Sequence, residues 1–236
     1  MSQTPTSKTI VVIGFGPGVS TSVAEKFGAE GFSVALVARG EAKLAAGVEA
    51  LKGKGIAAAA FPADAADPAQ VRAAIAKASA TLGPIGAIHW NAYAGQGFGD
   101  LLSVDPTTLP GLFDVGLVGL LSAVQEALAD LKAAGDGAVL VTNGAFGELN
   151  PMIDNMVLAM GVTGVALANA AKAKLVGLLS ARLKAEGIYV GEVTIAGVVK
   201  GTGPEAPGFP TLEGADIADA FWRLYKARGE VRARMG

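Results

Sequence analysis

Short runs of apolar, often β-branched residues alternate along this chain with longer alanine-rich segments of helical periodicity. Runs that are apolar throughout are typical of strands in a parallel sheet covered on both faces. Strands and helices in regular alternation predict βαβ units. We therefore predict one α/β domain over residues 1–236, a doubly wound parallel sheet of six or seven strands with helices on both faces.

The individual elements follow from periodicity and from residues that begin or end helices. Asp67 and Pro68 have the residue types of an N-cap and a first helical position, so a helix is expected to start there. Strands are expected within 9–14, 33–39, 56–64, 85–92, 137–143 and 188–197, and further helices at 18–31, 40–55, 107–134, 159–187 and 214–227.

Four other segments carry weaker signals. Residues 1–7 are expected to be a flexible tail, and 229–235 could be a seventh strand or a frayed end. The loop 144–160 and the segment 198–213, rich in Gly and Pro, have the character of a substrate lid.

Composition excludes several kinds of function. The chain has no Cys and a single His, His89, so thiolate sites and His-pair metal sites are excluded and no metal is expected. Lys and Arg number 19 against 21 Asp and Glu, which gives no basic surface for nucleic acid. The N-terminus lacks the apolar core of a signal peptide, and no uninterrupted apolar run is long enough to cross a membrane. A cytoplasmic protein is expected, with His89 in the core.

Three glycines, Gly14, Gly16 and Gly18, lie directly between the first strand and the first helix. In that context glycines let the backbone approach a pyrophosphate, and the helix N-terminus stabilises its charge. The loop thus predicts a dinucleotide site on a Rossmann-like fold. An ordinary strand-to-helix turn is the alternative.

The ends of the second and third strands bear on which dinucleotide would bind. Arg39 stands where an acidic residue would bond the ribose 2′-hydroxyl of NAD, and an Arg there suits the 2′-phosphate of NADP. Asp64 follows the third strand, in a position that resembles the adenine-contacting acid of a known dinucleotide-binding family. The alternatives are a solvated Arg39 and a capping or turn role for Asp64. NADP(H) is therefore expected rather than NAD(H).

Further motifs occur in order over residues 8–202. Asn91-Ala92-Tyr93 follows the fourth strand, Ala196-Gly197 follows the sixth, and AAKAKLVGLL occupies 170–179. With the glycine loop, in which Ser20 replaces the last glycine, these segments resemble the short-chain dehydrogenase/reductase family. The resemblance implies that the cofactor contacts Gly14, Phe15, Gly16, Pro17, Gly18, Val19, Arg39, Asp64, Ala65, Asn91, Ala92, Lys172, Gly197 and Val199.

The resemblance breaks at the catalytic positions. The family's Asn, Ser and Tyr correspond to Gly116, Gly144 and Ala168, and only the family's Lys remains, as Lys172. The resemblance therefore implies a divergent member that lacks the usual proton donor. General acid help is worth about 10²–10⁴-fold, so hydride transfer to an electrophilic substrate remains possible.

Three residues are candidates for the remaining chemistry: Lys172, Asn143 and Tyr93. Lys172 could act directly or through a water in the space left by Ala168, and Asn143 lies at a strand end where α/β sheets bind ligands. The alternatives are a surface lysine, a turn-forming Asn and a Tyr93 that only walls the pocket. We expect the space at Ala168 and Gly144 to hold water or admit a bulkier substrate; Thr142 and Asn169 flank it.

Two functions remain open on the sequence alone. One is an NADP-dependent oxidoreductase with an atypical active site, acting on a small carbonyl, imine or quinone-like substrate. The other is a non-catalytic NADP(H)-binding sensor or scaffold. In either case the small and apolar residues of 107–134 and 159–187 predict a homodimer or homotetramer built on these helices.

Overall fold

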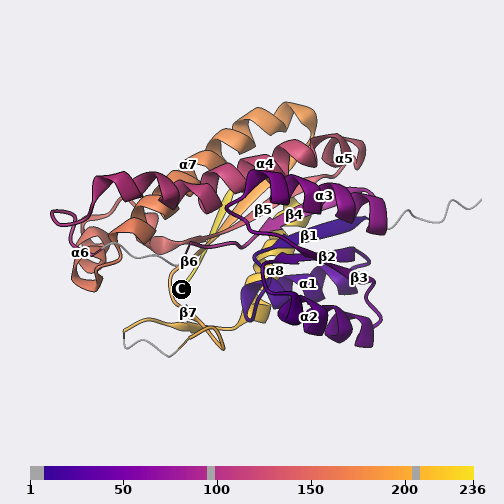
Figure 1. Ribbon diagram of the computed structural model, residues 1–236, viewed down its shortest axis with the longest axis horizontal. Coiled ribbons are helices and arrows are strands. Elements are labelled where there is room, and N and C mark those ends of the chain that lie inside the picture. Colours follow the sequence, from indigo (N-terminus) through magenta and orange to yellow (C-terminus); the bar gives the residue numbers. More distant parts are fainter. Residues whose placement is uncertain (1–7, 95–98, 204–207) are drawn as a thin grey trace, which may run out of the picture.

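The computed structural model describes residues 8–94, 99–203 and 208–236, and within them a parallel sheet of seven strands forms the centre of the molecule (Figure 1). The strand order is β3-β2-β1-β4-β5-β6-β9, and every neighbouring pair is parallel. The strands are β1 (Thr9–Ile13), β2 (Ser33–Ala38), β3 (Ala58–Pro62), β4 (Ile85–Trp90), β5 (Ala138–Gly144), β6 (Tyr189–Ile195) and β9 (Arg232–Met235). The predicted doubly wound sheet is confirmed, and 229–235 does supply a seventh strand. The expected tail, 1–7, lies outside the described residues.

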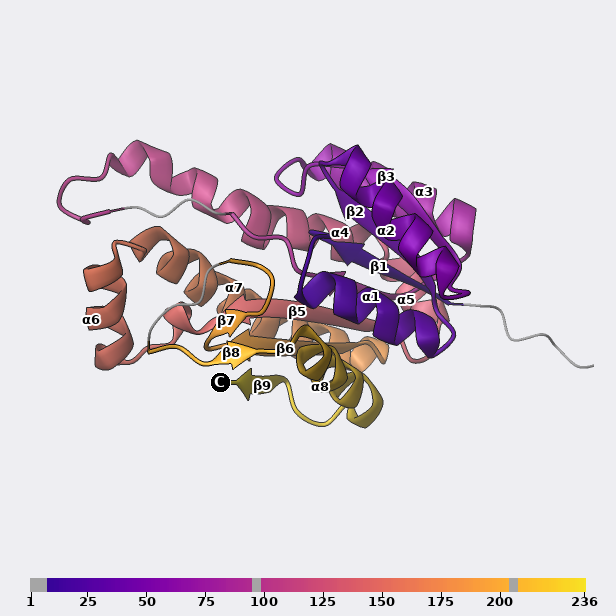
Figure 2. The same cartoon turned by 90° about the horizontal axis from the view of Figure 1, so that it is seen from below.

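Helices cover both faces of the sheet, as the alternation of side chains along a strand requires. Ile10 and Val12 of β1 point to one face, and Val11 and Ile13 point to the other. The first face is covered by α1 (Val19–Ala29), α2 (Glu41–Gly53) and α8 (Gly214–Ala227) (Figure 2). The second face is covered by α3 (Pro68–Leu82), α4 (Leu120–Glu126), α5 (Leu128–Ala133) and α7 (Thr163–Leu183).

The start of α3 shows a local prediction that holds in detail. Asp67 accepts hydrogen bonds from the backbone N–H groups of Ala69 and Gln70 at 2.9 and 3.2 Å, and Pro68 is the first helical residue. These bonds satisfy donors that the helix itself leaves free. The bonds from Gln70, backbone and side chain, hold the pKa of the Asp67 carboxyl below its usual value.

The continuous helix predicted over 107–134 is wrong. The chain forms a 3₁₀ turn, η1 (Pro106–Gly111), a π-helical turn, η2 (Asp114–Gly119), and then α4 and α5. Pro110 lacks the N–H that a continued α-helix would need. By length and apolar composition alone the stretch Pro106–Ala133 could cross a membrane, but its inner face packs on the sheet through core residues such as Leu120 and Ala123.

The loop predicted over 144–160 is also wrong, because it contains a helix. After a 3₁₀ turn, η3 (Ala145–Gly147), the chain forms α6 (Pro151–Met160), which lies at one end of the molecule (Figure 1). Asn150 caps this helix by accepting from the Met152 N–H at 2.9 Å, and Gly161 ends it in the left-handed region with φ 64°. Consequently α7 begins at Thr163 rather than at 159, and it runs to Leu183 before a 3₁₀ turn, η4 (Lys184–Glu186).

Candidate cofactor groove and active site

A cavity of about 620 Å³ opens at the carboxyl ends of the first four strands. Strand order reverses between β1 and β4, and ligands of open α/β sheets bind at such a switch point. Of the residues expected at the cofactor or catalytic site, the cavity is lined by Gly14, Phe15, Arg39, Asp64, Ala65, Asn91, Ala92 and Tyr93. The fold thus brings together candidates that are far apart in the sequence.

The glycine loop lies directly against the end of β4. Gly14 has φ 83°, and a Cβ there would lie 2.4 Å from the Ala92 backbone nitrogen. Asn91 donates a hydrogen bond from its amide to the Gly14 carbonyl at 3.3 Å. The Ser20 hydroxyl, in place of a third loop glycine, is hydrogen-bonded to the backbone of Gly16 at 2.9 Å. The loop is therefore tied at both ends.

The segment after β6 reaches back over the start of α1. A small second sheet pairs β7 (Val198–Val199) with β8 (Thr211–Leu212). A Cβ on Gly18, at φ 81°, would lie 2.5 Å from Thr202 Cγ2 and 3.1 Å from Val199 Cγ1. Val199 therefore sits beside the residue that precedes α1. Gly197 lies at the base of the small sheet, where a Cβ would meet the Pro210 carbonyl oxygen at 2.4 Å.

Two charged residues at the rim differ in how they are engaged. Arg39 is exposed, and no other side chain or backbone group in the described parts of the chain bonds or pairs with its guanidinium. Asp64 accepts a hydrogen bond from the Ala66 N–H at 3.0 Å, so its carboxylate shapes the turn after β3. Arg39 is thus free to bind an anion, whereas Asp64 has a structural bond in addition to its place in the groove.

Lys172 lies on α7 and is almost fully buried, with 6% of its surface exposed. Its stem packs beside Gly116 of η2, where a Cβ would lie 3.9 Å from Lys172 Cδ. Burial lowers the pKa of Lys172 to about 8, an effect that the carboxylate of Glu192 partly opposes. The alternative of a surface lysine is therefore wrong.

The space at Gly144 is not open, which corrects the expectation of a water or a bulkier substrate there. The side chain of Asn169 fills it: a Cβ on Gly144 would lie 2.6 Å from Asn169 Nδ2. Asn143 is buried, donating from Nδ2 to the Asn169 carbonyl at 3.0 Å and accepting at Oδ1 from the Gly144 N–H at 3.0 Å. Tyr93 is 61% exposed and lines the groove of Gly14, away from the cavity that Asn143 lines.

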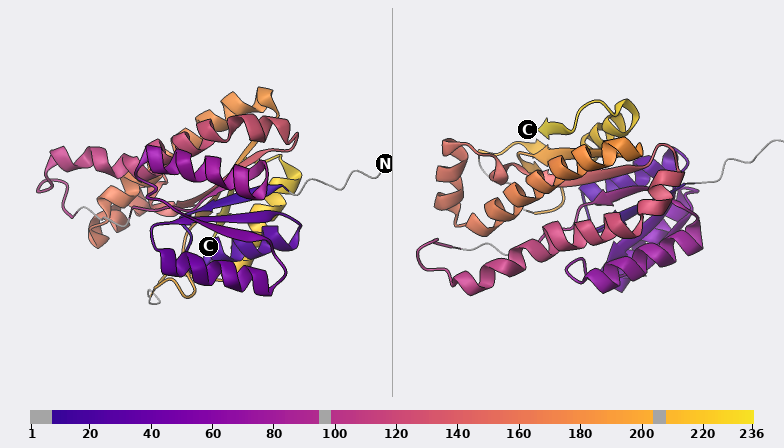
Figure 3. Two further views of the ribbon diagram at one scale, coloured as in Figure 1. Left: turned by 45° about the vertical axis from the view of Figure 1, so that its right-hand side comes forward. Right: turned by 90° about the horizontal axis from the view of Figure 1, so that it is seen from above.

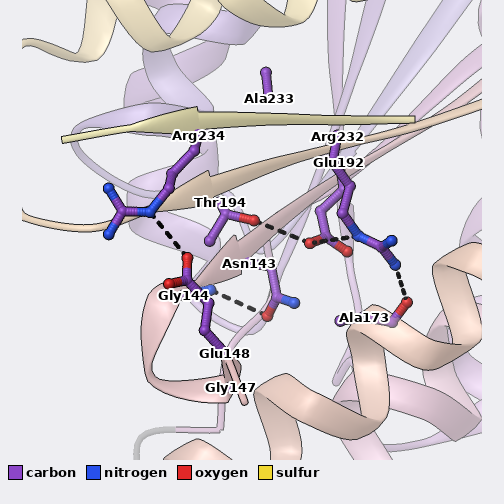
Figure 4. A pocket seen from close by; sticks show the side chains of 10 residues that line it. All are labelled: Asn143, Gly144, Gly147, Glu148, Ala173, Glu192, Thr194, Arg232, Ala233 and Arg234. Atoms are coloured by element: carbon purple, nitrogen blue, oxygen red, sulfur yellow. Dashed lines mark hydrogen bonds and ion pairs between the residues drawn. The ribbon is translucent and has the colours of Figure 1, made fainter. Parts of the chain in front are cut away.

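A second cavity, of about 340 Å³, lies between β6, β9 and the turn after β5 (Figure 4). Glu192 of β6 is 1% exposed there, and its Oε1 accepts from Thr194 Oγ1 at 3.0 Å and pairs with Arg232 Nε at 3.5 Å. Arg232 also donates to the Ala173 carbonyl at 2.5 Å, so it links β6 to the residue after Lys172. Glu192 is not among the site residues predicted from the sequence, although a carboxylate within an apolar strand is a usable signal.

His89 of β4 is a core residue, as expected. It is fully buried, its Nε2 lies 3.0 Å from Thr142 Oγ1, and its ring meets that of Phe221 edge to face with centroids 4.8 Å apart. Burial lowers the pKa of His89 to about 3, so the imidazole is neutral near pH 7. It takes no part in the groove.

The chain belongs to the short-chain dehydrogenase family, whose sequence model, described as short chain dehydrogenase, matches residues 8–202. Its class is accordingly that of the NAD(P)-dependent oxidoreductases.

Three individual proteins illustrate the likeness. The 3-oxoacyl-[acyl-carrier-protein] reductase FabG of Staphylococcus aureus is 26% identical over 219 residues, which are 91% of this chain and 78% of that one. A metagenomic short-chain oxidoreductase solved in complex with NADP superposes with a TM-score of 0.79 at 22% identity, over 97% of this chain and 96% of the other. L-Sorbose reductase from Gluconobacter frateurii, complexed with NADPH and L-sorbose, gives 0.82 at 18% identity, over 98% and 95%.

Proposed function

We propose that this protein is an NADP(H)-dependent oxidoreductase with an atypical active site that reduces a small carbonyl, imine or quinone-like substrate. The preference for NADP(H) over NAD(H) is inferred from Arg39, whose guanidinium is unpaired and lies at the rim of the groove that contains the glycine loop. Two similar structures carry NADP or NADPH in their complexes. When bound, the dihydronicotinamide supplies the hydride.

The chain's own residues supply binding and orientation. The loop Gly14–Val19, of which Gly14 and Phe15 line the groove, would hold the pyrophosphate, and Arg39 would pair with the 2′-phosphate. Asp64, Ala65, Asn91 and Ala92 line the groove and would hold adenine and ribose, and Gly197 and Val199 would lie at the nicotinamide end. A single domain of residues 1–236 carries the whole site, with 198–213 as a substrate lid, of which 204–207 lie outside the described residues.

The active site is atypical because three side chains of the family pattern are replaced by Gly116, Gly144 and Ala168. Lys172 then has two tasks, to hold the nicotinamide ribose and to deliver the proton. A pKa of about 8 suits a proton donor near neutral pH, since the group is mostly charged there and gives up its proton readily. Asn143 acts as a positioning residue through its bond to the Asn169 carbonyl, and Tyr93 walls the outer pocket.

A non-catalytic NADP(H) sensor is the second candidate, favoured by the same three replacements. To distinguish the reductase from the sensor, NADPH oxidation is followed with a panel of ketones, imines and quinones, and the affinity for NADPH is measured in parallel. Turnover on one class supports the enzyme. Tight binding with no turnover on any class supports the sensor.

Replacing Arg39 with Ala should weaken NADPH binding about 10- to 100-fold and leave NADH binding nearly unchanged, because a charge-assisted bond is worth about 1.5–3 kcal/mol. Fluorescence titration of both cofactors measures the effect. Arg223→Ala, at an exposed position of α8, is the control and should leave both affinities unchanged. Equal losses for NADPH and NADH would show that Arg39 does not contact the 2′-phosphate.

We further propose a homodimer or homotetramer in the cytoplasm, without nucleic-acid or membrane partners. Figure 3 shows η2 and α4 running beside α7, and the exposed apolar residues of these segments would form the contact. They are Val118, Leu121, Leu167 and Leu178. Light scattering should give a multiple of the 23.5 kDa chain mass, and Leu121→Glu with Leu178→Glu should give the monomer. Leu102→Glu, at an exposed apolar residue outside these segments, is the control; a monomeric wild type would contradict the proposal.

A further inference from the structure

Asn169 is a polar residue of α7 that lies against Gly144, one of the residues that line the second cavity. It follows Ala168 on α7, precedes Lys172 by three residues, and is 5% exposed. Residues three apart on a helix lie on the same side, so the Asn169 amide and the Lys172 ammonium belong to one surface of α7.

Two glycines, the last residue of β5 and the last residue of η3, make room for this side chain. A Cβ on Gly144 would lie 2.6 Å from Asn169 Nδ2, so this nitrogen occupies the place where a side chain of residue 144 would begin. A Cβ on Gly147 would lie 2.8 Å from Asn169 Cβ and 2.4 Å from the Ala170 nitrogen. Asn143 holds the backbone at this point through its bond to the Asn169 carbonyl at 3.0 Å, and Figure 4 shows Asn143, Gly144 and Gly147 together at the end of β5 and in η3.

The side-chain amide of Asn169 makes no hydrogen bond with the rest of the described protein. Among residues 8–94, 99–203 and 208–236, no group forms a hydrogen bond with its Nδ2 or Oδ1. Neighbouring Asn143, by contrast, uses both ends of its amide. Its Nδ2 and Oδ1 are not among the described side-chain atoms that are buried without a partner, so the unpartnered amide still reaches solvent and can bond a ligand.

We propose that the Asn169 amide is a catalytic residue that donates a hydrogen bond to the carbonyl oxygen of the substrate. The proposal rests on the proposed reductase function and narrows its substrate to a neutral carbonyl, because a protonated imine has no lone pair to accept the bond. It also explains why residues 144 and 147 are glycines: a Cβ at 144 would meet the donor itself, and a Cβ at 147 would meet the backbone of Asn169 and Ala170.

The proposed step is the reduction of the substrate carbonyl to an alcohol. The carbonyl carbon receives hydrogen with its electron pair from the dihydronicotinamide, which leaves as the oxidised nicotinamide, and the C=O π pair becomes a lone pair on oxygen. The Asn169 N–H stabilises this developing negative charge. The Lys172 ammonium then transfers one proton to the oxygen, giving the alcohol and a neutral amine, which water reprotonates.

The test compares the wild type with Asn169→Leu, which keeps the approximate size and removes the donor. With isatin or diacetyl as the carbonyl probe, kcat should fall about 100- to 1000-fold, as for loss of an oxyanion donor, while NADPH affinity stays within twofold. Gln125→Leu, which removes an exposed side-chain amide of α4, is the control and should keep full activity. An active Asn169→Leu variant with unchanged kcat would overturn the proposal.

A second readout does not depend on turnover. The carbonyl stretch of isotope-labelled isatin, bound with NADP⁺, should lie at lower frequency in the wild type than in Asn169→Leu, because a hydrogen bond weakens the C=O bond. Equal frequencies would overturn the assignment of Asn169 even if the wild type is active. A wild type that binds NADPH but reduces no probe would contradict the reductase function separately, and the frequency difference would still decide the role of Asn169.

Gly144→Ala gives an independent variant if Asn169→Leu does not fold. Its Cβ would take the place of Asn169 Nδ2, so kcat should fall in the same direction although Asn169 is retained. Unchanged kcat in a folded Gly144→Ala variant would contradict the proposal.

Discussion

NADPH binding should be lost when Gly14 is replaced by Ala, and the free energy of unfolding should fall by more than about 2 kcal/mol. Two causes add. A left-handed backbone costs about 1–3 kcal/mol for a residue with a Cβ, and Gly14 has φ 83°. The new methyl group would lie 2.4 Å from the Ala92 nitrogen and 2.7 Å from the Asn91 carbonyl carbon, which are backbone atoms that no side-chain rotation can clear. Overpacking of this kind costs about 1–3 kcal/mol in addition.

Urea unfolding and a fluorescence titration measure the two effects. Gly53→Ala is the control, because a Cβ at the end of α2 would meet no atom within 4 Å and Gly53 does not have positive φ. A Gly14→Ala variant that unfolds at the wild-type urea concentration would show that the glycine loop does not rest on the end of β4.

Replacing Lys172 with Met should stabilise the protein without cofactor while weakening NADPH binding. Burial lowers the Lys172 pKa from 10.5 to about 8, which corresponds to about 3 kcal/mol against folding when the group is charged in the unfolded chain. The unfolded state binds the proton more tightly, so this cost is fully present below pH 8 and is lost as the pH rises to 10.5. The variant should therefore gain up to about 3 kcal/mol at neutral pH and almost nothing in strong base.

Urea unfolding over that pH range measures the stability difference, and a titration with NADPH measures binding. Lys174→Met changes an exposed lysine of the same helix and should show neither effect. A Lys172→Met variant that binds NADPH as tightly as the wild type would show that Lys172 does not hold the nicotinamide ribose. A stability difference independent of pH would show that Lys172 titrates as it does in the unfolded chain.

Local features of this protein could be predicted from the sequence because their causes lie within a few residues. Asp67 and Pro68 begin α3 through bonds to the next residues along the chain, and the continuous apolar run Ile10–Ile13 places apolar side chains on both faces of β1. The position of the glycine loop between β1 and α1 could likewise be predicted from the residues on either side of it. Even α6 had its start and end signals in Asn150-Pro151 and Gly161, although the apolar composition of the segment and its expected role as a loop obscured them.

Tertiary structure alone decided which side chains meet in the candidate active site, because these pairs are distant in sequence. Asn169 fills the space beside Gly144, Glu192 lies near enough to Lys172 to oppose the fall in its pKa, and Arg232 joins β6 to α7. The sequence by itself determined the class of fold and the position of the glycine loop. Hydrophobic periodicity and turn-forming residues fix the backbone conformation locally, among residues close together in the sequence. The sequence could not determine which side chain fills the space beside a residue such as Gly144. That depends on how closely β5 and α7 approach each other, and their separation is set by packing across the whole sheet.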